Sequence, residues 1–350
     1  MSYLGYSVYI STFPQQKAFL ATLKNKETYI FTSLHIAEEM NEAYVQQATD
    51  MLVWLNEQGF KVIGDVSKRT LELFKEADIV KLARRLELYM IRIDYGFNDE
   101  EMMALAKSFP IVFNASTVDS ALAQKLKQVS KDIFAIHNYY PREYTGLSSK
   151  QFTAINQRLQ QEFIQVFGFI PNHKKSRGPI YQGLPTVESE RYLPTAVSYF
   201  EMSLGMAMDN ILLSDLALEP LDQQMIEVYE TTHIVSLPCM LEKSFESLYE
   251  QVFTIRIDSP ECAYRLQESR EFATQGTLIE PINCLERIVG SITCDNRHYG
   301  RYSGEIQVIR EALPRDYRVN VIGKVVQEYV KLTEIIKNGQ KIKLIKYEIS

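Results

Sequence analysis

The first 215 residues alternate short apolar runs of strand character with segments that have the apolar spacing of helices. The runs are 4–10, 29–34, 61–66, 89–94, 110–115, 133–138, 167–172 and 210–215. Such alternation is typical of βα units around a parallel sheet. Their number and length match an α/β fold of the (β/α)₈ TIM-barrel type, and an open doubly wound sheet is the alternative. The first run continues without a glycine-rich dinucleotide fingerprint, so we predict the barrel.

The pattern changes near residue 235. Runs such as SITCD and KIKLIK then follow one another, broken by Gly, Asn, Asp and Pro, with little helix between them. A chain of 350 residues with 46% hydrophobic content can bury one large core and a smaller one. We therefore predict a TIM-barrel domain at 1–235, which would carry any catalytic site, and a small, mostly β domain at 236–350.

Charge and composition argue against several partners. The net charge of −6 comes from interspersed residues without a basic stripe, so nucleic acid is not expected. No run reaches the roughly 18 apolar residues of a membrane span, and the first residues lack the features of a secretory signal. The four cysteines form no CxxC pair, so we expect neither zinc nor disulfides, and a cytoplasmic location.

Functional groups of a TIM barrel lie where the strands end. Buried polar groups need partners, so those at the predicted strand ends either pair with one another or line a pocket. The polar residues at these ends are Ser7, Tyr9, Thr32, His35, Asp65, Asp94, Asn114, His137, Asn138, Asn172, His173, Ser214 and Asp215. For Asp65 a helix cap is the alternative, and for Asp94 a simple pair with Arg92. No His or Cys has zinc-like spacing, and we expect no metal or cofactor.

Two loops carry the strongest signals. HNYYPREYTGLS (137–148) combines tyrosines with hydrogen-bonding groups, as a sugar-binding rim requires, although aromatic core residues are the alternative. HKKSRGPIYQGLPTVESER (173–191) places basic residues after the seventh strand, where barrels often bind phosphate, and a solvated basic loop is the alternative. Glu188 and Arg191 are three residues apart, which also suits a surface ion pair.

Several motifs together resemble the bacterial 6-phospho-N-acetylmuramidases, a family of glycoside hydrolases. They are LGYSVY, RIDYGF, FNAS, HNYYPREYTGLS, RGPIYQGLPTVESER, NRHYGRYSGEIQV and NVIGKV. The resemblance implies a TIM barrel followed by a cyclophilin-like β-barrel. It also implies cytoplasmic hydrolysis of the β-1,4 bond between N-acetylmuramic acid 6-phosphate and N-acetylglucosamine in cell-wall recycling. The chain departs from the family after the first strand, where relatives often carry a glutamate and this sequence reads SVYISTFP.

Glycoside hydrolysis usually requires two carboxyl groups, about 5 Å apart for retention and roughly 6.5–9.5 Å apart for inversion. We expect Asp94 and Glu188 to be this catalytic pair, with Asp215 in reserve, unless the substrate's own N-acetyl group is the nucleophile. The residues expected to bind the disaccharide are Tyr9, Asn114, His137, Asn138, Tyr140, Arg191 and Asp215. Lys174 or Arg177 is expected to bind its phosphate, and Arg301 is the alternative if the second domain folds over the barrel mouth.

Other functions stay open. A sugar-phosphate isomerase or aldolase would use the same phosphate loop, but usually needs a metal or a lysine at a strand end, and no lysine ends the eight runs. A non-catalytic phospho-sugar sensor would keep the aromatic rim without two carboxylates. Homo-oligomers are compatible with the sequence.

Overall fold

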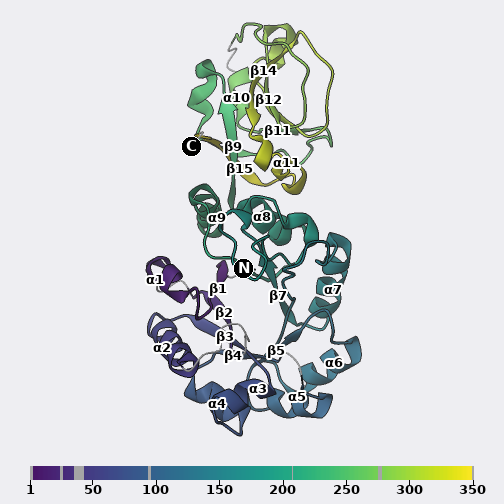
Figure 1. The fold of residues 1–350 in the computed structure, drawn as a ribbon. Helices are drawn as coiled ribbons and strands as arrows, with labels where there is room; N and C mark the ends of the chain where they lie inside the picture. Colours follow the sequence, from purple (N-terminus) through teal and green to yellow (C-terminus); the bar gives the residue numbers. More distant parts are fainter. Residues whose placement is uncertain are drawn as a thin grey trace. The chain divides into compact units, whose positions relative to one another are not determined.

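The computed structural model describes residues 3–23, 27–34, 43–93, 96–206, 208–274 and 278–348 (Figure 1). The chain separates into two compact units, residues 1–219 and 220–350. Helix α9 (Pro220–Thr232) belongs to the second unit, because it leads directly into strand β9 (Ile234–Leu241) and packs against it. The division therefore lies one helix before the predicted boundary at residue 235.

The first unit is a closed barrel of eight parallel strands in chain order. They are β1 (Gly5–Ser7), β2 (Tyr29–Ser33), β3 (Lys61–Val66), β4 (Met90–Ile93), β5 (Ile111–Asn114), β6 (Ile133–Ile136), β7 (Gln165–Ile170) and β8 (Asn210–Leu213). Pairing of Gly5 with Leu212 and of Tyr6 with Leu213 closes the ring. The predicted TIM barrel is confirmed, and every predicted run contains or overlaps one of these strands.

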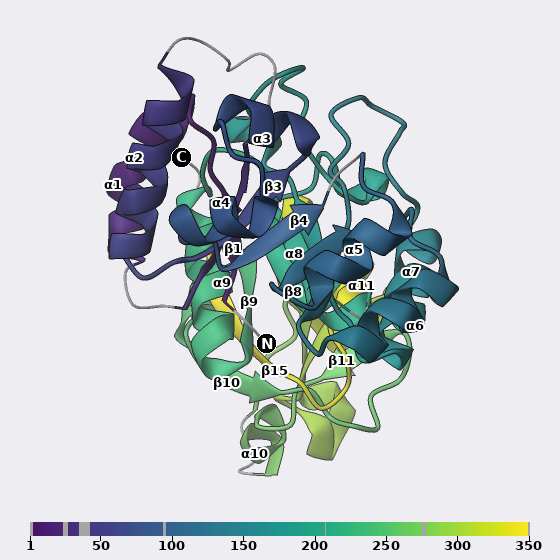
Figure 2. The same ribbon diagram turned by 90° about the horizontal axis from the view of Figure 1, so that it is seen from below.

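Helices cover the outside of the strands (Figures 1 and 2). They are α1 (Phe13–Thr22), α2 (Tyr44–Glu57), α3 (Lys68–Leu73), α4 (Ile79–Arg85), α5 (Asp99–Ala106), α6 (Ser120–Val129), α7 (Ser149–Gln161) and α8 (Thr195–Gly205). Local sequence sets several ends: the side chain of Ser148 accepts the N–H of Gln151 at the start of α7. Gly59, with φ of +83°, ends α2 in the left-handed conformation that glycine adopts most easily.

Apolar side chains fill the barrel interior. A cluster of buried residues is contributed by the strands and by the turn after β1, namely Tyr9, Phe31, Ile63, Met90, Val112, Ile136, Phe167, Phe169 and Leu212. Because this core closes the barrel as a packed solid, a ligand can enter only at its ends. Among the described residues, no helix is both long enough and apolar enough to cross a membrane.

The second unit is built on a seven-stranded sheet in the order β10-β15-β9-β14-β12-β13-β11. The strands besides β9 are β10 (Val252–Thr254), β11 (Ala263–Arg265), β12 (Ser291–Asp295), β13 (Ile306–Ile309), β14 (Val319–Val325) and β15 (Lys341–Lys346), with short helices α10 (Ser269–Thr274) and α11 (Leu332–Ile335). A bridge between Ile255 and Leu266 joins the two edges, so the sheet curls on itself. The predicted mostly β character is confirmed, while cyclophilin-like topology stays a prediction. All four cysteines, which lie in this unit, are free.

Candidate active site at the C-terminal end of the barrel

A pocket of about 760 Å³ opens where the barrel strands end. It is lined by Ser11, Thr12, Gln15, Phe31, Ser33, Asp65, Arg92, His137, Asn138, Tyr139, Pro141, Phe169, Arg177, Gly178, Pro179, Tyr181 and Leu216. These residues come from the ends of most barrel strands and from the loops that follow them. The pocket therefore lies at the face that carries the active sites of TIM-barrel enzymes.

Asp65 is the carboxylate of the described pocket lining. It lies on β3 and is 5% exposed, and the Arg92 guanidinium on β4 donates to its Oδ1 at 2.5 Å. Arg92 also donates to Asn138 Oδ1 at 2.6 Å, which connects β3, β4 and the loop after β6. A charged partner at this distance favours the ionised carboxylate. Asp65 does not cap a helix, since α3 begins after Ser67.

Arg177 is one of two arginines in the described pocket lining, and the other, Arg92, is paired with Asp65. The Arg177 guanidinium lies 3.6 Å from the centre of the Tyr9 ring and 5.1 Å from that of Tyr139. Nε donates to the Ser214 carbonyl at 3.0 Å, while Nη2 is buried without a hydrogen-bond partner in the described part of the chain. A fixed guanidinium with an unused donor suits an anionic ligand.

Tyr9 and Asp215 are buried residues that contact Arg177, Tyr9 through its ring and Asp215 through the Arg177 backbone N–H. Tyr9 is fully buried, does not line the pocket, and donates from its hydroxyl to that of Tyr139 at 3.2 Å. Asp215 is also fully buried and accepts the backbone N–H groups of Asn172, Arg177 and Leu184 at 2.9, 3.0 and 3.2 Å. Both residues hold the loop after β7 rather than face a ligand.

Three other predicted residues of the first unit contribute no side chain to the lining. Lys174 is exposed. The Asn114 side chain accepts the Ser116 N–H at 3.0 Å and so shapes the turn after β5. Tyr140 bonds through its backbone N–H to the Pro185 carbonyl at 2.9 Å, while its neighbour Tyr139 faces the pocket. Arg301, in the second unit, donates to the Tyr302 hydroxyl at 2.9 Å.

His137 lines the pocket in its neutral form. Asn156 donates through Nδ2 to the Met206 carbonyl at 3.0 Å, so its Oδ1 faces His137 Nε2 at 2.8 Å and accepts a proton from it. His137 Nδ1 is then the acceptor for the Ser116 hydroxyl at 3.2 Å. Burial lowers the pKa of His137 to about 4. At neutral pH the imidazole is therefore uncharged and held in place, and it is not a general acid.

The shifted pKa predicts a loss of stability in acid. Between pH 6.5 and about 4, the imidazole of His137 is protonated in the unfolded chain but not in the folded chain. The free energy of unfolding is therefore unaffected by this group above pH 6.5 and decreases as the pH drops below it. In urea titrations, the free energy of unfolding of wild type should fall by about 3 kcal/mol more than that of His137→Gln over this range. Parallel curves would contradict a buried neutral His137.

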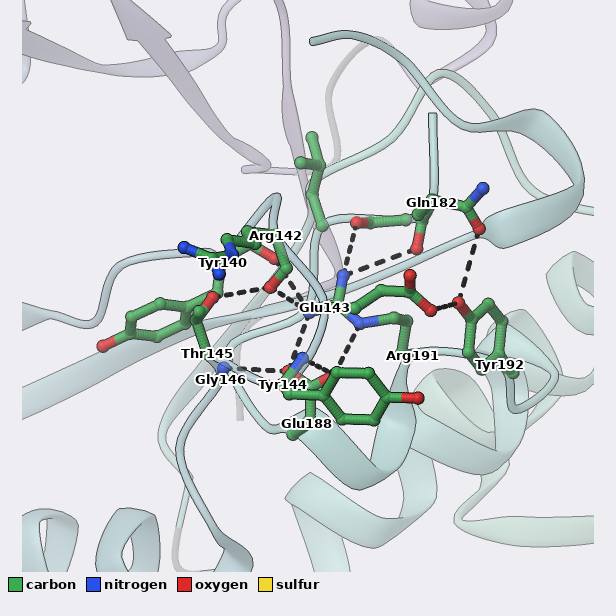
Figure 3. A network of polar contacts seen from close by, with 12 residues as sticks. Tyr140, Arg142, Glu143, Tyr144, Thr145, Gly146, Gln182, Glu188, Arg191 and Tyr192 are labelled. Carbon is green, nitrogen blue, oxygen red and sulfur yellow. Dashed lines mark hydrogen bonds and ion pairs between the residues drawn. The ribbon is translucent and has the colours of Figure 1, made fainter. Parts of the chain in front are cut away.

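Glu188 and Arg191 form an ion pair beside the pocket without lining it (Figure 3). Arg191 donates to both carboxylate oxygens of Glu188 at 2.7 Å, and the N–H groups of Tyr144 and Gly146 donate to them as well. These hydrogen bonds, led by those from Arg191, lower the pKa of Glu188 to about 2. A carboxylate so held cannot supply a proton near neutral pH. Asp94, the other expected catalytic carboxylate, lies outside the described residues.

The fold and the pocket define a TIM-barrel protein with a pocket of polar and aromatic side chains at its C-terminal face. Among the described residues, no group of three or more His, Cys, Asp or Glu side chains could hold a metal ion. Two family models match the chain: 6-phospho-N-acetylmuramidase, N-terminal, over residues 4–227, and 6-phospho-N-acetylmuramidase, C-terminal, over residues 235–345. The chain belongs to the 6-phospho-N-acetylmuramidase family.

Two solved structures share the fold over the whole chain. A conserved protein of unknown function from Enterococcus faecalis is 28% identical with a TM-score of 0.86, covering 99% of this chain and 96% of that one. An uncharacterized B. cereus protein is 21% identical with a TM-score of 0.80, covering 99% and 100%. The curated proteins contain no match to this chain.

Proposed function

We propose that the protein hydrolyses the β-1,4 bond between N-acetylmuramic acid 6-phosphate and N-acetylglucosamine, in the cytoplasm, during cell-wall recycling. Membership of the family supports the reaction class. The observation that carries the substrate is Arg177, a stacked pocket guanidinium with an unused buried donor. Its positive charge suits a phosphate group, and Asn138 and Tyr139 in the same lining can hydrogen-bond a sugar.

Asp65 and Asp94 are the carboxylates that we assign to the reaction. Arg92 holds Asp65 ionised, which suits a nucleophile or a carboxylate that balances the positive charge of an oxocarbenium-like transition state. Asp94 follows β4, two residues after Arg92, and we assign it as the proton donor to the leaving oxygen. Glu188, assigned to this chemistry from the sequence, is left out because four donors already occupy its oxygens.

The remaining polar groups of the pocket are proposed to hold the sugar rings. Asn138 and Tyr139 offer an amide and a phenol, while His137, whose two nitrogens bond Asn156 and Ser116, offers only its ring carbons. Arg177 binds the 6-phosphate, while Lys174 is left out because its exposed side chain does not line the pocket. Arg301 stays an expectation from the sequence.

Phosphate selectivity tests the proposal. The phosphorylated disaccharide should be cleaved with a kcat/KM about 100-fold higher than that of the same disaccharide without phosphate. The unphosphorylated substrate cannot form the charge-assisted contacts to Arg177. Mass spectrometry of released N-acetylglucosamine measures both rates on one preparation. Equal rates would overturn the assignment of the phosphate.

A non-catalytic phospho-sugar sensor is the second candidate. It is favoured by one observation: Ser11 and Thr12 line the pocket just after β1 and bring hydroxyl groups but no carboxylate. A sensor would bind the disaccharide in isothermal titration and leave it intact. The aldolase alternative has weaker support, since no lysine is among the lining residues of the described pocket.

A further inference from the structure

Two long loops frame the pocket. The loop between β6 and α7, residues 137–148, contributes Asn138, Tyr139 and Pro141, and the loop between β7 and α8, residues 171–194, contributes the segment 177–181 in part. Neither loop contains a strand long enough to fix its shape, apart from the single bridge between Leu147 and Val187. Three backbone hydrogen bonds also join the loops, from the N–H of Tyr140 to Pro185 O, from that of Leu147 to Thr186 O and from that of Glu188 to Leu147 O. Side-chain contacts add to them.

Arg191 contacts both loops (Figure 3). Its side chain is 1% exposed, and besides Glu188 it donates to four backbone carbonyls. Nη2 bonds Tyr140 O at 3.0 Å and Arg142 O at 3.1 Å in the first loop. Nη1 bonds Gly183 O at 3.0 Å and, more weakly, Gln182 O at 3.4 Å in the second. One guanidinium thus gathers acceptors from both loops.

Glu188 also connects the loops, but as an acceptor of hydrogen bonds from backbone N–H groups. Its Oε1 accepts the Tyr144 N–H at 2.9 Å and its Oε2 accepts the Gly146 N–H at 2.8 Å, both in the first loop. Tyr144 has φ of +61°, a left-handed conformation that is unfavourable for tyrosine and is maintained by this contact. The carboxylate therefore faces donors, while the guanidinium faces acceptors.

A smaller contact continues the connection at the exposed rim. The Tyr192 hydroxyl, next to Arg191, donates to the carboxylate of Glu143 and contacts Gln182 Oε1 at 3.3 Å. Glu143 belongs to the first loop and Gln182 to the second. The same pair of loops is therefore held both at a buried point and at its surface.

We propose that Glu188 and Arg191 are a positioning pair, which holds the loops 137–148 and 171–194 in the arrangement that binds substrate and does not touch the reacting atoms. The proposal rests on the proposed function for the identity of the substrate. Positioning errors of about 1 Å can cost about 100-fold in rate, so a loosened pair should weaken catalysis without removing a catalytic group.

Glu188→Gln tests the pair directly. The variant keeps the shape but sets an NH₂ group against N–H donors, so we expect KM to rise about 10-fold to 100-fold, with kcat reduced by less than about 10-fold. The limbs of the pH profile of kcat should keep their positions. A kcat lowered by several orders of magnitude, or a missing limb, would show that Glu188 is a catalytic carboxylate.

Gly146→Ala loosens the same contact without removing a charge. Its Cβ would lie 2.7 Å from Glu188 Oε2 and 2.9 Å from the Glu188 backbone nitrogen, so the two loops must move apart. Gly205→Ala, where an added Cβ meets nothing within 4 Å, is the matched control. We expect a higher KM for Gly146→Ala and unchanged kinetics for Gly205→Ala. Wild-type KM in Gly146→Ala would overturn the proposal, even if Glu188→Gln fails to fold.

The charge-swapped double variant Glu188→Arg with Arg191→Glu tests whether the pair acts through its backbone contacts or only through the attraction between its two charges. A swap restores the opposite charges, yet sets a carboxylate against the four carbonyls and a guanidinium against the two N–H groups. We therefore expect no rescue of KM relative to Glu188→Gln. Recovery to the wild-type value would contradict the role of the backbone contacts.

Hydrogen exchange gives a readout that does not require turnover. In Glu188→Gln, the amides of residues 138–148 and 177–187 should exchange at least about 10-fold faster than in wild type, with the rest of the barrel unchanged. If wild type hydrolyses no disaccharide, this result still stands and only the proposed function fails. Unchanged exchange in these loops would overturn the positioning pair.

Discussion

Asp65→Asn is expected to lower kcat for the phosphorylated disaccharide by about 1000-fold, because it replaces the ionised pocket carboxylate by a neutral amide of the same shape. Arg92 holds Asp65 as the anion, at 2.5 Å, and the amide cannot balance a positive charge that develops in the transition state. Asp94→Asn should act in the same direction by removing the proton donor. Initial-rate kinetics on purified variants measure both effects.

The control for Asp65→Asn must separate chemistry from folding. Loss of one partner of a buried ion pair costs about 3–5 kcal/mol, so the folded fraction of each variant is determined by circular dichroism before its kinetics. Asp209→Asn is the matched control, since this barrel carboxylate accepts the Val166 N–H at 2.9 Å and does not line the pocket. A folded Asp65→Asn protein with near-normal kcat would remove Asp65 from the mechanism.

Arg177→Met is expected to lower kcat/KM for the phosphorylated disaccharide by about 100-fold and to leave the weak hydrolysis of the unphosphorylated one nearly unchanged. Methionine keeps part of the apolar contact with the Tyr9 and Tyr139 rings but has no donor for phosphate. The effect should be selective because only one of the two substrates carries the group that Arg177 binds.

Lys174→Met is the matched control for Arg177→Met. Both variants remove one positive charge from the same loop, but the Lys174 side chain is exposed and outside the pocket lining. We expect a change of less than about 2-fold from it, as for an exposed charge that solvent and salt screen. Equal losses in the two variants would mean that the loop's net charge attracts the substrate and that Arg177 has no specific role.

The barrel could be predicted from the sequence because its signals are local. Each strand of a parallel sheet is a short apolar run. The ends of the helices between them are marked by particular residues, such as Gly59 at the end of α2. Strand β9 was not predicted because Pro238 interrupts its apolar run, although the backbone accommodates it there. Strand β11 was not predicted because only three residues, Ala263–Arg265, form it.

The site could be predicted only in part. His137, Asn138 and Arg177 were assigned to the substrate from the sequence and line the pocket. Tyr139 lines the pocket although it was not assigned from the sequence, because the direction of a side chain after a strand depends on loop geometry that carries no period. The assignment of Tyr140 to the sugar stays a prediction. The ladder between β3 and β4 sets Asp65 directly opposite Arg92, a pairing of residues 27 positions apart that no local pattern indicates.

Glu188 and Arg191 illustrate the same limit. Their spacing of three residues predicted a pair, and the pair is present. Their partners in the loop 137–148 lie more than 40 residues away, so the sequence could not show that both side chains bind backbone groups of that loop. A carboxylate that looks catalytic in a motif can therefore be fully occupied in the fold.

Hydrolysis of the phosphorylated disaccharide by the wild-type protein, followed by proton NMR, tests the central claim most directly. We expect the anomeric signal of the β-1,4 linkage to disappear, while N-acetylmuramic acid 6-phosphate and N-acetylglucosamine form in equal amounts. A disaccharide that binds to the protein and stays intact through prolonged incubation would contradict a hydrolase and favour a sensor.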